Sequence, residues 1–171
     1  MTFEIIFNGS DMGGRDYTCQ GKTLAFVLPI MESLTSGPNA KGRNTTYGRD
    51  PSVIVLVPTR ELAKQVHVDF EVYGGVVGLH SSSVYGGAPY GPQEYALHRG
   101  VDIIVGTPGS IKDHIERGTS NLKSLKFHVL DKVDEILNMG FVEYVETILG
   151  KFEDESKVQT LLFSAKMPDW V

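Results

Sequence analysis

The chain has a single cysteine, Cys19, and few long apolar runs. One cysteine cannot form an intrachain disulfide, a usage that fits a reducing compartment. The longest apolar run, near Leu24 to Ile30, is far too short to span a bilayer, so we expect no membrane segment. The N-terminal residues MTFEIIFNGSD include acidic residues and no basic stretch, which argues against a secretory signal.

An excess of positive charge is also absent. The formal net charge is -5, so any binding of nucleic acid must come from a local basic patch. Apolar residues make up 41% and charged residues 22% of the chain, which is ordinary for a globular protein. A length of 171 residues suits one domain with a full core, and we expect that domain to cover residues 1–171.

Several short, β-branched runs predict strands. Most are continuously apolar rather than alternating, which is typical of strands buried on both faces of a parallel sheet. Strand and helix patterns alternate, so the sequence predicts an α/β domain with a mostly parallel, doubly wound sheet and helices on both faces. In such sheets ligands bind at the carboxyl ends of the strands. The runs are residues 53–57, 81–85, 102–106, 127–131 and 160–165.

Helical periodicity fills the segments between these runs. Apolar residues recur on one face after Thr59, a residue type that caps helix N-termini. The stretch Ser36 to Asp50 is instead rich in Gly, Asn, Thr and basic residues, which predicts a surface loop. Such a loop is either a solvated connection or a contact for a polyanion. The helical patterns contain Leu62, Val66, Phe70 and Tyr73; Ile111 and Ile115; and Val142, Val145 and Ile148.

Two stretches carry nucleotide chemistry. Gly21-Lys22-Thr23 opens a helix, where backbone amides face an anion, a lysine reaches the outer phosphates and a threonine hydroxyl can ligate Mg²⁺. A chance helix start is the alternative. In the stretch VLDKVDEIL, an apolar run ends in Asp131, and Asp134 follows three residues later. A nucleotide hydrolase presents a metal-binding carboxylate in this way at a strand end.

Taken in order along the chain, these segments resemble the first RecA-like domain of DEAD-box RNA helicases. The wording from Asn138 onward, NMGFVEYVETILGKFEDESKVQTLLFSA, looks like the plant branch related to the nucleolar Gu-type helicase. The matches are Thr18, Gly21, Lys22 and Thr23 in motif I; Pro58 to Ala63, PTRELA, in motif Ia; Gly86-Gly87 in the GG motif; Thr107-Pro108-Gly109 in motif Ib; Asp131 and Asp134 in the DEAD box; and Ser164-Ala165 in the SAT motif.

The resemblance implies a site for ATP and Mg²⁺ and a surface for RNA. It places the nucleotide on Thr18, Gly21, Lys22 and Thr23, and the metal near Thr23 and Asp131. It assigns the catalytic roles to Asp131, Asp134 and Ser164. It runs the RNA backbone across Pro58, Thr59, Arg60, Gly86, Gly87, Thr107, Pro108 and Gly109. It also implies residence in the nucleus or nucleolus, with cytoplasm and chloroplast as alternatives.

The residue types on the RNA side agree with this assignment. Arg60 can pair with a phosphate, and glycines let backbone amides approach one. Thr107 supplies a hydroxyl beside a helix N-terminus. Each also has a purely structural interpretation: solvated helix charges for Arg60 and Glu61, a turn for Gly86-Gly87, and a helix entry for residues 107–109.

Departures from the family pattern predict weakened catalysis. Lys132 stands where the family's glutamate positions the attacking water, and it could pair with Asp131. Asp16 and Cys19 alter motif I, since glycine is expected at position 16. Lys166 replaces the SAT threonine, and Ser110 replaces an arginine after motif Ib. We also expect the Q motif and the second RecA-like domain to be absent, and therefore impaired hydrolysis and unwinding.

Other functions remain open at this point. One is a non-catalytic module that binds RNA or protein through motifs Ia, GG and Ib. Another is a truncated product without a function. A P-loop kinase or GTPase is disfavoured, because PTRELA, GG and TPG occur in order and no guanine-reading motif is present.

Overall fold

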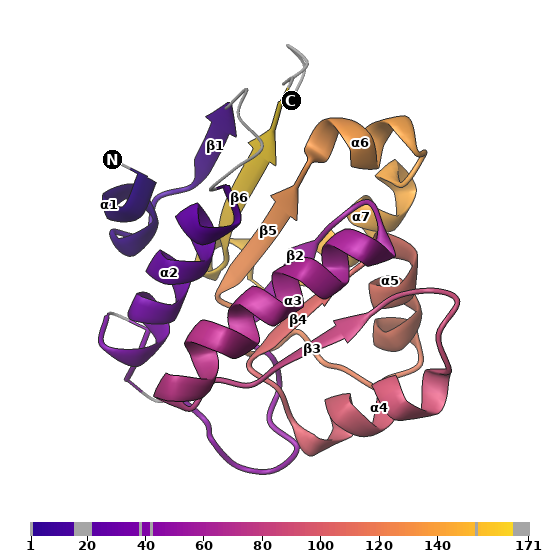
Figure 1. Cartoon of the computed structure of the whole chain (residues 1–171), viewed down its shortest axis with the longest axis horizontal. Coiled ribbons are helices and arrows are strands. Elements are labelled where there is room, and N and C mark those ends of the chain that lie inside the picture. Colours follow the sequence, from indigo (N-terminus) through magenta and orange to yellow (C-terminus); the bar gives the residue numbers. More distant parts are fainter. Residues whose placement is uncertain (1, 16–21, 38, 42, 153, 166–171) are drawn as a thin grey trace.

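The computed structural model describes residues 2–15, 22–37, 39–41, 43–152 and 154–165. Within them, strands form one 6-stranded sheet in the order β1-β6-β5-β2-β4-β3, and every neighbouring pair is parallel (Figure 1). The predicted parallel α/β sheet is confirmed. The strands are β1 (Met12–Arg15), β2 (Val53–Leu56), β3 (Ser81–Val84), β4 (Ile103–Gly106), β5 (Phe127–Asp131) and β6 (Gln159–Ser164).

Helices cover both faces of this sheet, as a doubly wound fold requires. Helices α1, α2 and α3 pack on one face, and α2 and α3 cross the front of the sheet in Figure 1. Helices α4 to α7 pack on the other. The helices are α1 (Thr2–Phe7), α2 (Lys22–Thr35), α3 (Arg60–Gly74), α4 (Tyr90–Arg99), α5 (Pro108–Glu116), α6 (Val133–Asn138) and α7 (Val142–Leu149), with short 3-10 turns η1 (Gly75–Val77) and η2 (Glu155–Lys157).

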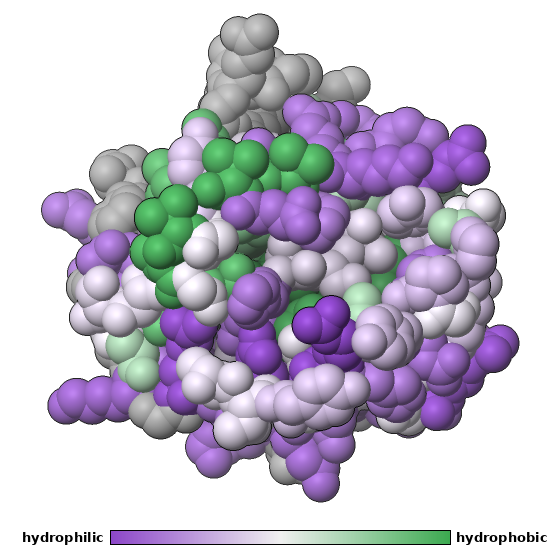
Figure 2. Space-filling view, turned by 60° about the horizontal axis from the view of Figure 1, so that its bottom comes forward, coloured by the Kyte–Doolittle hydropathy of each residue, from purple (hydrophilic) through white to green (hydrophobic). Residues whose placement is uncertain are grey.

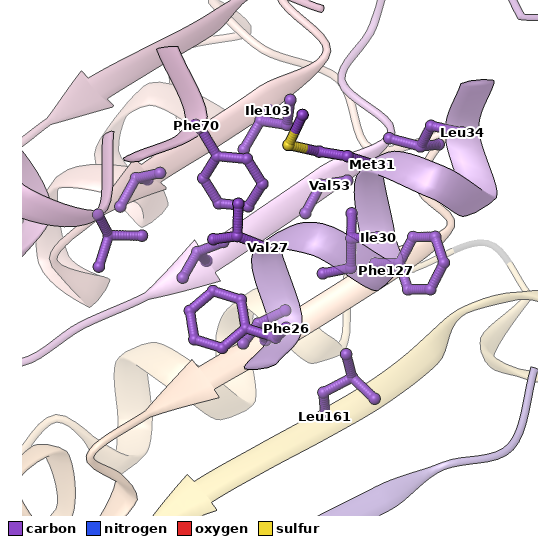
Figure 3. Packing of buried hydrophobic residues seen from close by; sticks show 14 of the residues in the cluster. Phe26, Val27, Ile30, Met31, Leu34, Val53, Phe70, Ile103, Phe127 and Leu161 are labelled. Carbon is purple, nitrogen blue, oxygen red and sulfur yellow. The ribbon is translucent and has the colours of Figure 1, made fainter. Parts of the chain in front are cut away.

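Central strands send alternate side chains into two separate cores. In β2, Val53 and Val55 join the cluster under α2 and α3, whereas Ile54 and Leu56 join the cluster under α4 to α7. Because both faces of the strand are buried, every position must be apolar, which explains the continuous run in the sequence. Figure 3 shows the first of these clusters, where Phe26 of α2 packs between strands and helix α3.

Strand β3 differs because it lies at the edge of the sheet. It pairs only with β4, and its burial alternates, with Ser82 and Val84 buried and their neighbours partly exposed. One buried row is enough for an edge strand, so serines are tolerated there. The opposite edge, β1, has the sequence MGGR. Its two glycines hide it from a search for apolar runs, and the sequence predicted neither β1 nor helices α1, α4 and α6.

The start of α3 and the loop before β2 agree with the local sequence signals. Helix α3 begins after Thr59, whose hydroxyl accepts a hydrogen bond from the amide of Leu62 at 3.3 Å, so the predicted N-cap is confirmed. No helix or strand lies between Thr35 and Val53 in the residues described there, in agreement with the predicted loop. Among the described residues, no helix is both long and apolar enough to cross a membrane.

Candidate functional site

The candidate residues follow the carboxyl ends of neighbouring strands. Pro58 and Thr59 follow β2, Gly86 and Gly87 follow β3, and Thr107 follows β4. Asp131 ends β5, and Ser164 ends β6. All these strands are parallel, so their carboxyl ends meet at one edge of the sheet, at the arrow tips in Figure 1.

Asp131, Asp134 and Ser164 come together at the ends of β5 and β6. Asp131 and Ser164 are both buried. The hydroxyl of Ser164 donates to Asp134 Oδ1 at 2.8 Å and also accepts the backbone amide of Asp134 at 3.3 Å. This double contact joins the start of α6 to the end of β6, and so brings together residues 30 apart in the sequence.

Lys132, between these aspartates, has an unusual backbone. Its φ of 55° and ψ of 53° lie in the left-handed region, and it is the one non-glycine residue with positive φ in the part of the chain described. Its ammonium lies 3.5 Å from Glu135 Oε1, and both side chains are almost half exposed. The lysine therefore turns toward the first turn of α6, where Glu135 meets it.

Motif I is described only in part. Lys22 is the first residue of α2, and Thr23 is partly buried in the first helical turn. Thr18 and Gly21 lie outside the described residues, as do Asp16, Cys19 and Lys166. Across the described residues, no group of three or more His, Cys, Asp or Glu side chains could hold a metal ion.

Motif Ia places one cation at this edge. Arg60 begins α3, and its Nε lies 2.7 Å from Glu61 Oε1, with both side chains exposed. A side-chain hydrogen bond between them raises the pKa of Arg60 and lowers the pKa of Glu61. Pro58 is buried at the turn from β2 into α3.

The GG segment lies against Arg60. A Cβ placed on Gly87 would lie 3.3 Å from Arg60 Nη1, and the φ of Gly87 is 82°, a conformation that other residues rarely adopt. A Cβ on Gly86 would lie 3.9 Å from the hydroxyl of Ser110. Segments following three different strands thus meet within van der Waals reach.

Motif Ib starts helix α5. Thr107 precedes its first turn, and the Thr107 hydroxyl donates to the Ser110 hydroxyl at 3.2 Å. Pro108 is buried, and Gly109 is partly exposed. Strand β4 needs glycine at its last position, because a Cβ on Gly106 would lie 2.2 Å from the carbonyl oxygen of Val84, the last residue of β3. Because β3 and β4 end this close together, the first turn of α5 begins near the GG segment that follows β3.

The structure thus brings the described candidates into two groups on one edge. Asp131, Asp134 and Ser164 form one, and the exposed parts of residues 59–60, 86–87 and 107–109 form the other. Sequence reasoning missed two neighbours of the second group. Tyr144 of α7 lies 3.9 Å from a Cβ placed on Gly109, and Lys112 lies over the Tyr144 ring. No local pattern signals this contact, because the residues are far apart in the chain.

The six-stranded parallel sheet with helices on both faces is that of a RecA-like domain, as two solved structures show. A DEAD box protein from Methanococcus jannaschii superposes with a TM-score of 0.83 at 39% identity, covering 98% of this chain and 42% of that one. A hypothetical ATP-dependent RNA helicase from Sulfolobus tokodaii gives 0.82 at 30% identity, covering 98% and 45%.

Sequence relatives make the assignment more specific. Residues 1–171 match the DEAD/DEAH box helicase family, and the chain belongs to that family. It is 62% identical over 170 residues to DEAD-box ATP-dependent RNA helicase 7 of Oryza sativa, covering 99% of this chain and 24% of that protein. It is 46% identical over 173 residues to Nucleolar RNA helicase 2 of Rattus norvegicus, covering 99% and 21%. The chain spans about a quarter of these relatives.

Proposed function

We propose that this chain is an ATP- and RNA-binding RecA-like domain of a DEAD-box RNA helicase, with impaired ATP hydrolysis. The observation that carries the proposal is the convergence of separate sequence segments at one edge of the sheet. Asp131, Asp134 and Ser164 occupy one part of that edge. Arg60 and Gly87 occupy the other. A domain with phosphate chemistry and RNA contacts on one edge can couple the two.

The nucleotide half rests on residues of motif I and the DEAD box. In this proposal Lys22 would bind the outer phosphates, and Thr23 and Asp131 would hold the magnesium ion. Mg·ATP supplies the phosphoryl group that is transferred to water. Ser164 orients Asp134 through the two hydrogen bonds at 2.8 and 3.3 Å, so it acts as a positioning residue within the proposed catalytic group.

Lys132 is the reason for proposing impaired hydrolysis. Phosphoryl transfer depends on positioning the attacking water and on electrostatic stabilisation. A charged lysine cannot accept a proton, and Lys132 turns toward Glu135 at 3.5 Å. Glu135 lies beside this lysine in the first turn of α6, and the proposal gives it no catalytic role.

The RNA half rests on Arg60, the GG segment and the start of α5. Arg60 is exposed, and its present partner Glu61 is a neighbouring exposed carboxylate. Exposed pairs of this kind contribute little, so a phosphate of RNA can replace the carboxylate. The exposed backbone near Gly87 and Gly109 then offers amides to the next phosphates.

The first test is calorimetry of Mg·ATP binding to the purified chain, with Lys22→Ala as the control. Micromolar to millimolar binding that disappears in the control supports the nucleotide site. If the wild-type chain binds no Mg·ATP, the ATPase proposal fails. For catalysis, Lys132→Glu should raise ATP turnover at least about a hundred-fold, within the usual contribution of a positioned acid–base group. Equal turnover in both chains would contradict the role given to position 132.

A second candidate is a non-catalytic RNA-binding module, and Lys132 in place of the water-positioning glutamate favours it. Such a module binds RNA with an affinity that ATP does not change and that Arg60→Ala reduces. The full proposal instead predicts that Mg·ATP strengthens RNA binding. Titration of labelled RNA with and without Mg·ATP separates the two.

We also propose nuclear or nucleolar residence, which rests on similarity to a relative named as a nucleolar RNA helicase. Imaging of the full-length protein with a fluorescent tag tests this, and exclusion from the nucleus would overturn it.

A further inference from the structure

The candidate RNA surface continues past Gly109 onto two helices. Helix α7 packs against α5, and Tyr144 of α7 lies 3.9 Å from a Cβ placed on Gly109. Tyr144 is 39% exposed. Phe141, the N-cap residue just before α7, supports it, with ring centroids 5.8 Å apart. An exposed, supported tyrosine is the kind of platform on which a nucleic-acid base stacks.

A cation accompanies this ring. The Lys112 ammonium lies 5.5 Å from the Tyr144 ring centroid. Residues three apart on a helix share a face, so Lys112 lies one turn beyond Gly109 on the same side of α5. It is the only Lys or Arg in the helix sequence PGSIKDHIE. Ser110 contributes no charge, so Lys112 is the cation that α5 offers to a phosphate.

We propose that Lys112 and Tyr144 form a nucleotide subsite that extends the RNA-binding surface beyond Gly109. The ring of Tyr144 stacks on a base, and the ammonium of Lys112 contacts the adjacent phosphate. This subsite rests on the proposed RNA binding and adds a contact from a helix, α7, that the motif residues do not include.

The present partner of Lys112 makes this contact adjustable. Its ammonium lies 3.2 Å from Glu116, one helical turn further on, and both side chains are partly exposed. A solvated pair of this kind is weak and screened by salt, so a phosphate can displace the carboxylate. Glu116 nevertheless opposes the approach of a phosphate. The subsite therefore predicts opposite effects for neighbouring charges, which a purely structural ion pair does not.

The chain offers a matched control for the tyrosine. Tyr95 and Arg99 form another tyrosine–cation pair on α4, with the guanidinium 5.9 Å from the ring centroid. Tyr95 is 63% exposed, more than Tyr144. Arg99 ends α4 just before the amino end of β4, so this pair lies toward the opposite edge from Gly109. If exposed aromatic surface alone bound RNA, Tyr95 should matter at least as much.

The test is fluorescence anisotropy of a labelled single-stranded oligouridylate of about ten nucleotides, a length within the usual range of single-strand sites. Tyr144→Ala should weaken binding about ten-fold, the lower end of what one stacked base contributes, and Tyr144→Phe should bind like wild type. Tyr95→Ala should leave the affinity unchanged. Circular dichroism of each variant checks that it is folded.

The charges give a second, independent measurement. Lys112→Gln should lower the slope of log affinity against log salt by about 0.7, the value for one phosphate of a single strand. Glu116→Gln should strengthen binding about two-fold, since it removes a competing carboxylate. If Tyr144→Ala does not fold, this gain in Glu116→Gln decides: its absence overturns the subsite.

Arg60→Ala separates the two proposals. If the wild-type chain does not bind the oligonucleotide, or Arg60→Ala binds as well as wild type, the proposed RNA function itself fails and the subsite fails with it. If Arg60→Ala weakens binding but Tyr144→Ala matches both wild type and Tyr95→Ala, RNA binding stands and the subsite alone is overturned.

Discussion

Two arginine–carboxylate pairs lie at opposite edges of the sheet, and they differ in almost everything except distance. At the carboxyl edge, Arg60 and Glu61 approach to 2.7 Å with side chains 58% and 70% exposed. At the amino edge, Arg49 and Asp102 approach to 2.8 Å with side chains 8% and 3% exposed. Solvent thus screens the first pair and is nearly excluded from the second.

The buried pair belongs to a larger cluster. Arg49 donates to both carboxylate oxygens of Asp102, at 3.1 and 2.8 Å. Asp102 also accepts the backbone amide of His80 at 2.9 Å, and Arg43 Nε lies 3.7 Å from it. The loop before β2 is therefore fastened to the amino ends of β3 and β4. Figure 2, in which the lower side of Figure 1 comes forward, shows mostly hydrophilic and intermediate surface there, with the largest apolar area at the upper left.

Burial therefore decides what an arginine–carboxylate pair does in this fold: a buried pair stabilises the fold, and an exposed pair can exchange its partner. A buried, fully paired arginine has no reason to leave its carboxylate. An exposed arginine loses little by exchanging Glu61 for another anion. The loop from Ser36 to Asp50, whose basic residues suggested a polyanion contact, has two of its arginines engaged in this way. Its structural interpretation is therefore favoured for Arg43 and Arg49.

Removing the buried carboxylate should have the largest effect. Asp102→Ala leaves Arg49 buried without its partner and should lower the free energy of unfolding by about 3 kcal/mol. Urea denaturation measures it. In a double-mutant cycle with Arg49→Ala, the combined loss should be smaller than the sum of the single losses. Strict additivity would mean that the two residues stabilise the chain independently.

A buried histidine gives the next largest effect. His128 of β5 is fully buried beside Phe152, and neither ring nitrogen has a hydrogen-bond partner among the described residues. Burial lowers its pKa from 6.5 to about 3. Between these values the unfolded chain binds a proton that the folded chain does not. The free energy of unfolding therefore bears no proton-linkage penalty from His128 above about pH 6.5, and it falls as the pH drops toward 3.

Replacing His128 by leucine should remove this dependence. His128→Leu is expected to stabilise the chain by about 1–2 kcal/mol at pH 5, because it removes both the proton linkage and the unpaired nitrogens. The comparison is between unfolding free energies at pH 5 and pH 7 for each chain. The exposed His98→Leu serves as control for the replacement of a histidine by leucine. A steep dependence in His128→Leu would contradict this assignment.

The sequence predicted the central sheet because both faces of β2, β4 and β5 are buried. Continuous burial demands continuous apolar character, and that pattern is local. Edge strand β1 was not predicted from the sequence, because only its pairing with Leu161 to Ser164 of β6 identifies it as a strand. The candidate residues were predicted from family motifs, and the parallel sheet explains why those motifs meet.

Contacts between distant segments could not be predicted. Asp102 is 53 residues from Arg49, and nothing near either residue marks it as half of a buried pair. Lys112 and Tyr144 have the same property, since their contact depends on how α7 packs against α5. How two helices pack depends on the whole core. Helix capping and strand burial, in contrast, can be predicted from residues that are neighbours in the sequence.

A smaller effect should come from backbone strain at the carboxyl edge. Lys132 adopts a left-handed conformation that glycine adopts freely. We expect Lys132→Gly to be more stable than Lys132→Ala by about 1 kcal/mol, the usual penalty of a Cβ in this conformation. At Lys151, which lacks a positive φ, alanine should be at least as stable as glycine. If alanine is at least as stable as glycine at position 132 too, the left-handed conformation of Lys132 carries no such penalty.

The exposed pair should give the smallest effect on stability and a clear effect on binding. Glu61→Gln leaves the urea midpoint unchanged within error, because both side chains are already solvated. It should nevertheless strengthen RNA binding, since Arg60 no longer needs to leave a carboxylate to meet a phosphate. Anisotropy titrations of Glu61→Gln and wild type at the same salt measure this gain. A lower urea midpoint without a gain in affinity would place the Arg60–Glu61 pair with the structural cluster at the other edge.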